Sequence, residues 1–519
     1  MSAPAGGRIV KGASIREHLV LEADACVVGS GAGGSVVAHE LAEAGLGVVV
    51  LEEGPHVPTS AFVNDEGRSL LRLYRDGGFR GSADASVMLL EGRCVGGSTV
   101  VAMGTALAAP DAVLDAWARE SGVKDLGPAA MRAWFERVAS EISVNIVPDD
   151  FINANNRALL RGAQALGWPA EPLPRNTKGC MGCGNCAQGC PTRGKRSALV
   201  TYIPKALRAG AAIYADVRVE ALHARGGAIA GVSGQVLKTQ SGLPRQPIEV
   251  RAPIVVLAAG AIETPALLLR NHMTGRSGQV GRNLRVQPSP SVIGFFPETI
   301  RGYQGIPQSV WTAPSFDALH AGRGPFALAG SFAGPATIGL CVPGFGAGHK
   351  HLLAKYDRLA CVNVLLRDET TGEVREGRGT HPEIRYEPGD ADRAALFEGM
   401  REAARLLFRA GADKVIAGPR SGVILESETD LDHLDLPGVR RMPLRMSAFY
   451  PQGTCRMGVD PARAVVGPTG EVHGIRGLFV ADASIFPAPL GVPPQLTVMA
   501  LATRTAGAIA ADRRRYLGV

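Results

Sequence analysis

The sequence predicts an α/β fold with two lobes, and three observations support this prediction. The chain has 519 residues, 46% of them hydrophobic and 20% charged, which is enough to build two large cores. Residues 24–53 have the pattern of a strand, a glycine-rich turn, a helix and a second strand. Residues 284–445 alternate strand-like segments with Gly/Pro loops, which favours a mostly antiparallel sheet.

Charge and composition narrow the class of protein. The net charge of +7 is spread along the chain and forms no basic tail, which argues against a nucleic-acid partner. No stretch approaches the roughly 20 apolar residues of a membrane helix, and residues 1–13 lack the apolar core of a signal peptide. The nine cysteines do not form the pattern of a disulfide scaffold. We therefore expect a cytoplasmic protein without an integral membrane segment.

The turn after the first predicted strand has the spacing of a dinucleotide-binding turn. Gly29, Gly31 and Gly34 form G-x-G-x-x-G, and Glu52 ends the next strand. These glycines permit a tight turn, so that the N–H groups and the dipole of the following helix can stabilise a pyrophosphate. A carboxylate at Glu52 can accept hydrogen bonds from ribose hydroxyls. The segment therefore predicts a Rossmann-type unit for FAD or NAD.

Three further segments resemble the glucose-methanol-choline (GMC) oxidoreductase family. Residues 92–99 (GRCVGGST) are similar to its second flavin loop, and residues 257–265 (LAAGAIETP) to an internal segment of the family. Residues 453–458 (GTCRMG) and the strand and loop after them are similar to its C-terminal signature. The likeness extends to a bacterial subgroup of long-chain-alcohol and cholesterol oxidase-like proteins, whose four-cysteine loop resembles residues 180–207.

The resemblance implies an FAD-binding lobe made from three separate parts of the chain. Those parts are residues 19–110, 197–285 and 446–519, with a helical insertion at 111–177, a cysteine-rich loop at 178–196 and a substrate-binding domain at 286–445. The residues implied to contact FAD are Gly29, Gly31, Ala32, Gly34, Glu52, Gly97, Ser98, Val219, Ala259, Asp482, Ala483, Pro494 and Gln495. Val219 is expected near the adenine, and Asp482, Pro494 and Gln495 near the isoalloxazine.

The usual catalytic residues of the family are replaced in this chain. GMC enzymes commonly have a His in an H-P-x-G-T segment and a His or Asn in a V-N-P-x-like segment, but Tyr450 and Pro493 occupy these positions. Tyr450 is the predicted catalytic residue, since Pro493 has no side-chain proton to transfer. An unperturbed phenol has a pKa of about 10, so Tyr450 is a poor base and a better acid. The alternative is that Tyr450 only fills the space of an imidazole.

These features leave three interpretations of the function. The resemblance implies an FAD-dependent dehydrogenase that acts on the CH–OH group of a rather apolar alcohol. A tyrosine acid beside a flavin also suits an ene reductase or desaturase, in which Tyr450 donates or accepts the proton. Because the usual His is missing, a non-catalytic flavoprotein that carries electrons is the third interpretation.

The cysteine loop predicts a metal centre. Cys180, Cys183, Cys186 and Cys190, followed by Pro191, have the C-x2-C-x2-C-x3-C-P spacing of bacterial ferredoxins. The alternatives are an iron–sulfur cluster, 4Fe–4S with four thiolates or 3Fe–4S with three, a zinc ion held by four thiolates, or a loop without metal. A cluster would pass flavin electrons to an acceptor protein or a quinone.

Overall fold

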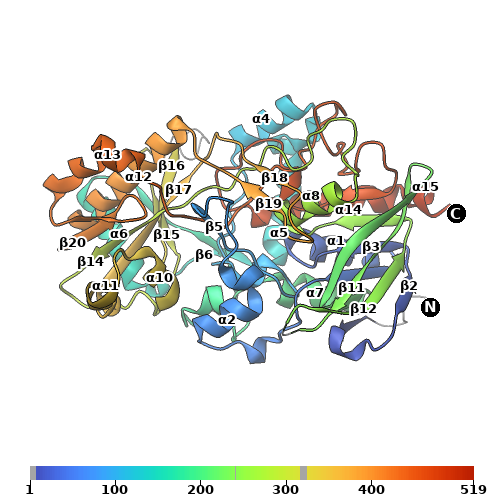
Figure 1. Cartoon of the computed structure of the whole chain (residues 1–519), viewed down its shortest axis with the longest axis horizontal. Helices are drawn as coiled ribbons and strands as arrows, with labels where there is room; N and C mark the ends of the chain where they lie inside the picture. The colour runs from blue at the N-terminus through green and yellow to red at the C-terminus, as the bar shows by residue number, and fades with distance from the viewer. Residues whose placement is uncertain (1–6, 240, 316–323, 519) are drawn as a thin grey trace.

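A parallel six-stranded sheet is the centre of the first lobe in the computed structural model, which describes residues 7–239, 241–315 and 324–518 (Figure 1). Its strands, in spatial order, are β1 (Arg8–Lys11), β9 (Ala212–Ala215), β4 (Val48–Glu52), β3 (Ala25–Val28), β13 (Ile254–Leu257) and β23 (Leu478–Val480). Every neighbouring pair is parallel. Helix α1 (Ala32–Glu43) connects β3 to β4, which confirms the predicted Rossmann-type unit.

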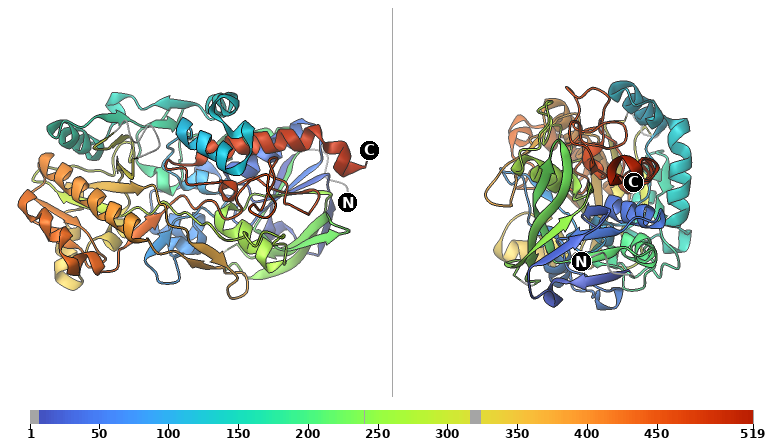
Figure 2. Two further views of the ribbon diagram at one scale, coloured as in Figure 1. Left: turned by 90° about the horizontal axis from the view of Figure 1, so that it is seen from above. Right: turned by 90° about the vertical axis from the view of Figure 1, so that its right-hand side faces the viewer.

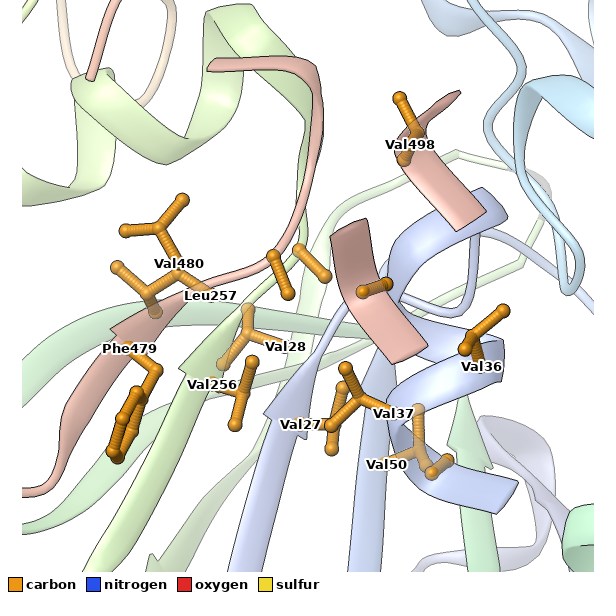
Figure 3. Close-up of a cluster of buried hydrophobic side chains, with 14 of the residues drawn as sticks. Val27, Val28, Val36, Val37, Val50, Val256, Leu257, Phe479, Val480 and Val498 are labelled. Carbon is orange, nitrogen blue, oxygen red and sulfur yellow. The ribbon is translucent and has the colours of Figure 1, made fainter. Parts of the chain in front are cut away.

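The central strands of this sheet are buried along their whole length. β3, β4 and β13 read ACVV, VVVLE and IVVL, the continuous apolar runs typical of strands covered on both faces. Figure 3 shows side chains of these strands gathered with those of α1 and of α14 (Gln495–Ala511), including Val37 and Val498. The core therefore joins the beginning, the middle and the end of the described chain.

A second, four-stranded sheet packs against the first. It has the order β10 (Val217–Arg225), β11 (Ala228–Leu237), β12 (Pro244–Arg251) and β2 (Leu19–Glu22). β10 contacts β4 and β11 contacts β13, while α1 packs against α14 and α7 (Tyr202–Arg208). The parallel sheet is thus covered by both helices and strands, as the end-on view in Figure 2 shows.

The second lobe is built on a seven-stranded antiparallel sheet, which confirms the predicted mostly antiparallel sheet. Its strands, in spatial order, are β21 (Val423–Leu425), β20 (Lys414–Ala417), β14 (Ser291–Phe295), β17 (Leu359–Leu366), β16 (Phe326–Gly330), β15 (Val310–Thr312) and β7 (Ala170–Pro172). Helices α12 (Asp390–Arg409) and α6 (Ala154–Ala165) pack against it and against each other. The chain before the cysteine loop therefore contributes both a helix and an edge strand to this lobe.

Two helices that precede the cysteine loop belong to the core of the first lobe. α4 (Asp111–Ser121) begins after Pro110 and ends at Gly122, and α5 (Pro128–Glu141) packs against α14. The fully buried Trp117 of α4 donates from Nε1 to the Ala488 carbonyl at 3.0 Å. Within the described ranges, no helix is long and apolar enough to cross a membrane.

The tight contact between α1 and the end of β23 yields a stability prediction. A Cβ atom at Gly33 would lie 1.6 Å from the Ala481 carbonyl oxygen, so Gly33→Ala must push α1 away from β23. We expect this variant to lose about 1–3 kcal/mol of unfolding free energy, the usual cost of overpacking a core. The measurement is urea or thermal denaturation.

The matched control is Gly507→Ala in α14. A Cβ there meets nothing within 4 Å, so this change is expected to be neutral or to stabilise the helix by about 0.5–1 kcal/mol. Equal effects of the two substitutions would contradict the packing argument.

Candidate functional site

A large cavity of about 490 Å³ lies at the carboxyl ends of the parallel strands. Its walls include the residues that follow β3, β4, β13 and β23, which is where open α/β sheets bind their ligands. Thirteen predicted site residues line it: Gly29, Gly31, Ala32, Glu52, Gly97, Ser98, Val219, Ala259, Tyr450, Asp482, Ala483, Pro494 and Gln495. Segments far apart in the sequence therefore meet around one cavity.

Gly97 and Gly34 are packed too closely against the glycine turn for side chains at these positions. Gly97 has φ +54°, and a Cβ there would lie 2.7 Å from the Gly31 Cα. Gly34 does not line the cavity, because it packs behind the turn, where a Cβ would lie 2.0 Å from the Gly29 oxygen. Gly31 and Gly97 thus present backbone to the cavity, and Gly34 allows α1 to approach β3.

Glu52 holds the glycine turn in place. Its Oε2 accepts hydrogen bonds from the Ser30 N–H at 2.9 Å and the Ser30 hydroxyl at 2.7 Å, and its Oε1 accepts from the Gly54 N–H at 2.8 Å. The Ser30 Oγ in turn accepts a hydrogen bond from the Gly96 N–H at 3.0 Å. This bond connects the turn to residues 92–99, which we call the second glycine loop. Burial raises the pKa of Glu52, and these hydrogen bonds oppose the rise.

Asp482 connects β23 to the start of α8 (Gly260–Arg270). Its Oδ2 accepts from the Thr264 hydroxyl at 2.5 Å and the Gly260 N–H at 2.9 Å, and its Oδ1 accepts from the Ser484 N–H at 2.8 Å. Burial raises the pKa of Asp482, while these donors favour the carboxylate. The side chain is thus engaged within the protein and orders the backbone that lines the cavity.

A network of ion pairs on one side of the cavity was not predicted from the sequence. Arg75 pairs with Glu53 at 2.8 Å, and Arg80 pairs with Glu263 at 2.7 Å. Burial raises the pKa of Glu53, but the charge and hydrogen bond of Arg75, together with the charges of Arg93 and Arg218, lower the pKa to about 2. The partners lie far apart in the sequence, so no local pattern indicates the network.

Tyr450 lies where the large cavity meets a second, smaller one of about 130 Å³. The ring is half-buried because it faces these cavities, but protein surrounds it, and burial raises the pKa of the phenol. The phenol is therefore neutral over the ordinary pH range. His381, which the sequence did not single out, also lines the large cavity, and no other histidine does so in the described part of the chain.

The smaller cavity is mostly apolar and reaches into the second lobe. Its wall residues on the antiparallel sheet and the helices near it include Leu70, Leu90, Val101, Ile293, Ile338, Leu365 and Phe449. Some of its polar side chains are hydrogen-bonded within the protein: Ser291 donates to Asn363 at 2.7 Å, and Gln308 accepts at 2.9 Å from Thr105, which lines the large cavity. This cavity suits the apolar part of a ligand.

The arrangement of the cysteine loop does not support the predicted metal centre. Cys183 is exposed, whereas Cys186 is buried with its Sγ 3.3 Å from Arg175 Nη2. Burial raises the pKa of Cys190, but hydrogen bonds from its neighbours lower it overall, and its Sγ accepts from the Lys195 N–H at 3.3 Å. Among the described residues, no three His, Cys, Asp or Glu side chains are grouped to hold a metal ion. Neither the iron–sulfur cluster nor the zinc ion is therefore supported by this arrangement.

Solved structures share the fold over nearly the whole chain. Pyridoxine 4-oxidase from Mesorbium loti superposes with a TM-score of 0.68 at 20% identity, covering 93% of this chain and 98% of that one. A variant of Aspergillus oryzae formate oxidase gives a TM-score of 0.71 at 18% identity, covering 97% of this chain and all of the other. These similarities support the two-lobed α/β fold.

Sequence relatives are also similar along most of the chain. An uncharacterized GMC-type oxidoreductase of Mycobacterium tuberculosis is 36% identical over 94% of this chain and 76% of its own length. Another uncharacterized GMC-type oxidoreductase, from Sinorhizobium fredii, is 31% identical over 96% of each chain. A long-chain-alcohol oxidase of Arabidopsis thaliana is 27% identical over 95% of this chain and 69% of its own.

Family models match the same segments that line the large cavity. Residues 27–73 match an NAD(P)-binding Rossmann-like domain. Residues 70–289 and 370–502 match the two GMC oxidoreductase models. With these matches and the extent of its relatives, the chain belongs to the GMC oxidoreductase family.

Proposed function

We propose that the chain is an FAD-dependent oxidoreductase that oxidises the CH–OH group of a rather apolar alcohol. The observation that carries this proposal is the meeting of two different cavities at Tyr450. The larger begins at a dinucleotide-binding turn, and the smaller has mostly apolar walls. A cofactor in the first and an apolar substrate in the second would meet beside this residue.

The large cavity fits FAD in its chemistry. The N-terminus of α1 and the side-chain-free backbone at Gly31 and Gly97 suit the pyrophosphate. Gln495 lines the same cavity, and its buried Nε2 has no hydrogen-bond partner within the described ranges, so it is available to a ligand. Bound FAD supplies a two-electron acceptor for a hydride from carbon.

The small cavity supports the apolar substrate. Its aliphatic walls favour an alkyl or similar body, because burying that surface releases it from water. The long-chain-alcohol oxidases among the relatives act on substrates of this kind by name, which agrees with the chemistry of the walls. The substrate would place its oxidised carbon at the junction and its apolar body away from the large cavity.

Tyr450 would contribute as a neutral hydrogen-bond donor. Since burial raises the pKa of the phenol, it can hold the substrate oxygen but cannot serve as a strong base at neutral pH. The hydroxyl proton would therefore pass to water or to another residue of the large cavity, for which His381 is a candidate. The raised pKa of Tyr450 also favours a second candidate, an ene reductase, because that reaction uses a protonated tyrosine beside a flavin; the reverse reaction of a desaturase would need Tyr450 as the base. The two candidates differ in which substrates reduce or reoxidise the flavin.

The first test of this proposal removes the phenol hydroxyl with Tyr450→Phe. If the hydroxyl contacts the substrate, flavin reduction should slow by about 10²-fold or more, the usual contribution of a positioned proton donor. FAD content should not change, since the ring itself stays. The measurement is anaerobic stopped-flow bleaching of the flavin with a panel of alcohols, and flavin reoxidation with a panel of enones.

Tyr516→Phe is the matched control for that variant, because Tyr516 packs against Phe479 and lines neither cavity. An unchanged rate in Tyr450→Phe would mean that the ring only fills space. If the wild-type flavin is neither reduced by any alcohol nor reoxidised by any enone, the non-catalytic electron carrier becomes the better interpretation.

The second test concerns FAD binding and uses Glu52→Gln. The amide replaces one acceptor oxygen with a donor, which must then face the Ser30 or Gly54 N–H and distort the glycine turn. We expect the dissociation constant for FAD to rise about tenfold or more, as is usual when a charge-assisted hydrogen bond is lost. Flavin fluorescence quenching on titration of apoprotein measures it.

Glu40→Gln provides the comparison, since Glu40 lies on α1 outside the cavity and pairs with Arg137 at 2.6 Å. Equal FAD affinity in both variants would argue against a role of Glu52 in shaping the turn.

A further inference from the structure

A short segment, residues 100–104, borders both cavities, and we name it the dividing segment. Ala102 and Met103 line the large cavity and the small one, as Tyr450 does. The segment includes the last two residues of α3 (Ser98–Val101), the short helix that begins directly after Gly97. Its backbone position therefore helps to set the width of the junction between the cavities.

Lys195, from the end of the cysteine loop, binds the dividing segment from behind. The side chain is 2% exposed, and its Nζ donates to the carbonyl oxygens of Val100 at 2.6 Å, Ala102 at 2.5 Å and Cys186 at 2.6 Å. An ammonium group has three N–H donors, so all three are used. One buried cation thus joins two carbonyls of the dividing segment to the middle of the cysteine loop.

Arg175 makes a parallel connection. It is fully buried, and its Nη2 donates to the Met103 carbonyl and lies 3.3 Å from the Cys186 Sγ. Gly104 allows this approach, because a Cβ there would lie 3.2 Å from the same nitrogen. Lys195 and Arg175 therefore both connect the dividing segment to Cys186 in the cysteine loop.

The hydrogen bonds of these two buried cations constrain the position of the dividing segment. Neither cation forms an ion pair with a carboxylate in the described part of the chain. Lys195 has three backbone carbonyls as acceptors, whereas Arg175 has the Met103 carbonyl and the Cys186 Sγ, and its Nε and Nη1 have no partner among the described residues. A buried charge without such partners costs several kcal/mol, which makes the position of these carbonyls energetically important. If the dividing segment moved away, Lys195 would lose two of its three acceptors and Arg175 would lose the Met103 carbonyl.

We infer that Lys195 and Arg175 are positioning residues: they fix the dividing segment at the junction of the cavities and make its position depend on the cysteine loop. The identity of the molecules that meet at the junction rests on the proposed function. The attachment of the dividing segment to the cysteine loop does not depend on the proposed function. The cysteine loop would thereby contribute to the geometry of the junction between the cavities.

The test uses Lys195→Met, which keeps most of the side-chain length and leaves three carbonyl oxygens without a donor. Hydrogen–deuterium exchange should become about tenfold faster in peptides that cover residues 98–106, as expected for the loss of strong hydrogen bonds, and remain unchanged in α12. In the FAD-loaded enzyme, the maximal rate of substrate-dependent flavin reduction should fall at least tenfold at unchanged FAD content. Unaltered exchange in residues 98–106 would overturn the inference.

Lys205→Met is the matched control. Lys205 on α7 pairs with Glu141 at 2.5 Å and lines neither cavity, so exchange in residues 98–106 and flavin reduction should both match the wild type. If Lys195→Met fails to fold, Cys186→Ala takes its place, since it removes only the Sγ beside Arg175. Hydrogen–deuterium exchange in residues 98–106 should then increase by a smaller factor than expected for Lys195→Met. Exchange equal to that of the wild type would refute the coupling between the dividing segment and the cysteine loop.

The two proposals fail in different ways. If no alcohol or enone reacts with the wild-type flavin, the proposed function is wrong, and the exchange measurement still decides the positioning inference. If the wild-type flavin is reduced and Lys195→Met reduces it equally fast with equal exchange, only the positioning inference is wrong.

Discussion

The close approach of backbone to backbone around the glycine turn is the constraint on which the rest of the structure depends. α1 lies against the end of β23 at Gly33, and the turn lies against the second glycine loop at Gly97. Neither contact leaves room for a side chain, so three separate parts of the chain meet with their amide groups exposed to one cavity. Glu52 and Asp482 then hold these parts with hydrogen bonds to N–H and hydroxyl groups.

Local sequence patterns predicted the elements of the first lobe well, because each pattern is complete within a few dozen residues. The alternation of apolar runs, glycines and a helix at residues 24–53 determines a βαβ unit almost by itself. The place of β7 at the edge of the second sheet, by contrast, depends on pairing with β15 about 140 residues later along the chain. Such long-range pairings leave no periodic signal in the sequence.

The residues of the site also fall into those that the sequence indicated and those that it did not. The family resemblance indicated the residues that line the large cavity, but the ion pairs around Arg75 and the place of His381 became visible only in three dimensions. The cysteine spacing predicted a metal centre because spacing states how far apart thiols are along the chain. It does not state where they point, and here Cys183 faces solvent while Cys186 lies beside Arg175.

The order of the strands has a consequence for biosynthesis. β23 and α14 follow residue 477, yet β23 pairs with β13 in the parallel sheet and α14 packs against α1. A nascent chain that ends before residue 478 has the glycine turn but lacks one edge of its sheet and the helix that buries its first βαβ unit. Most of the chain is therefore synthesised before the elements that complete the wall of the large cavity exist.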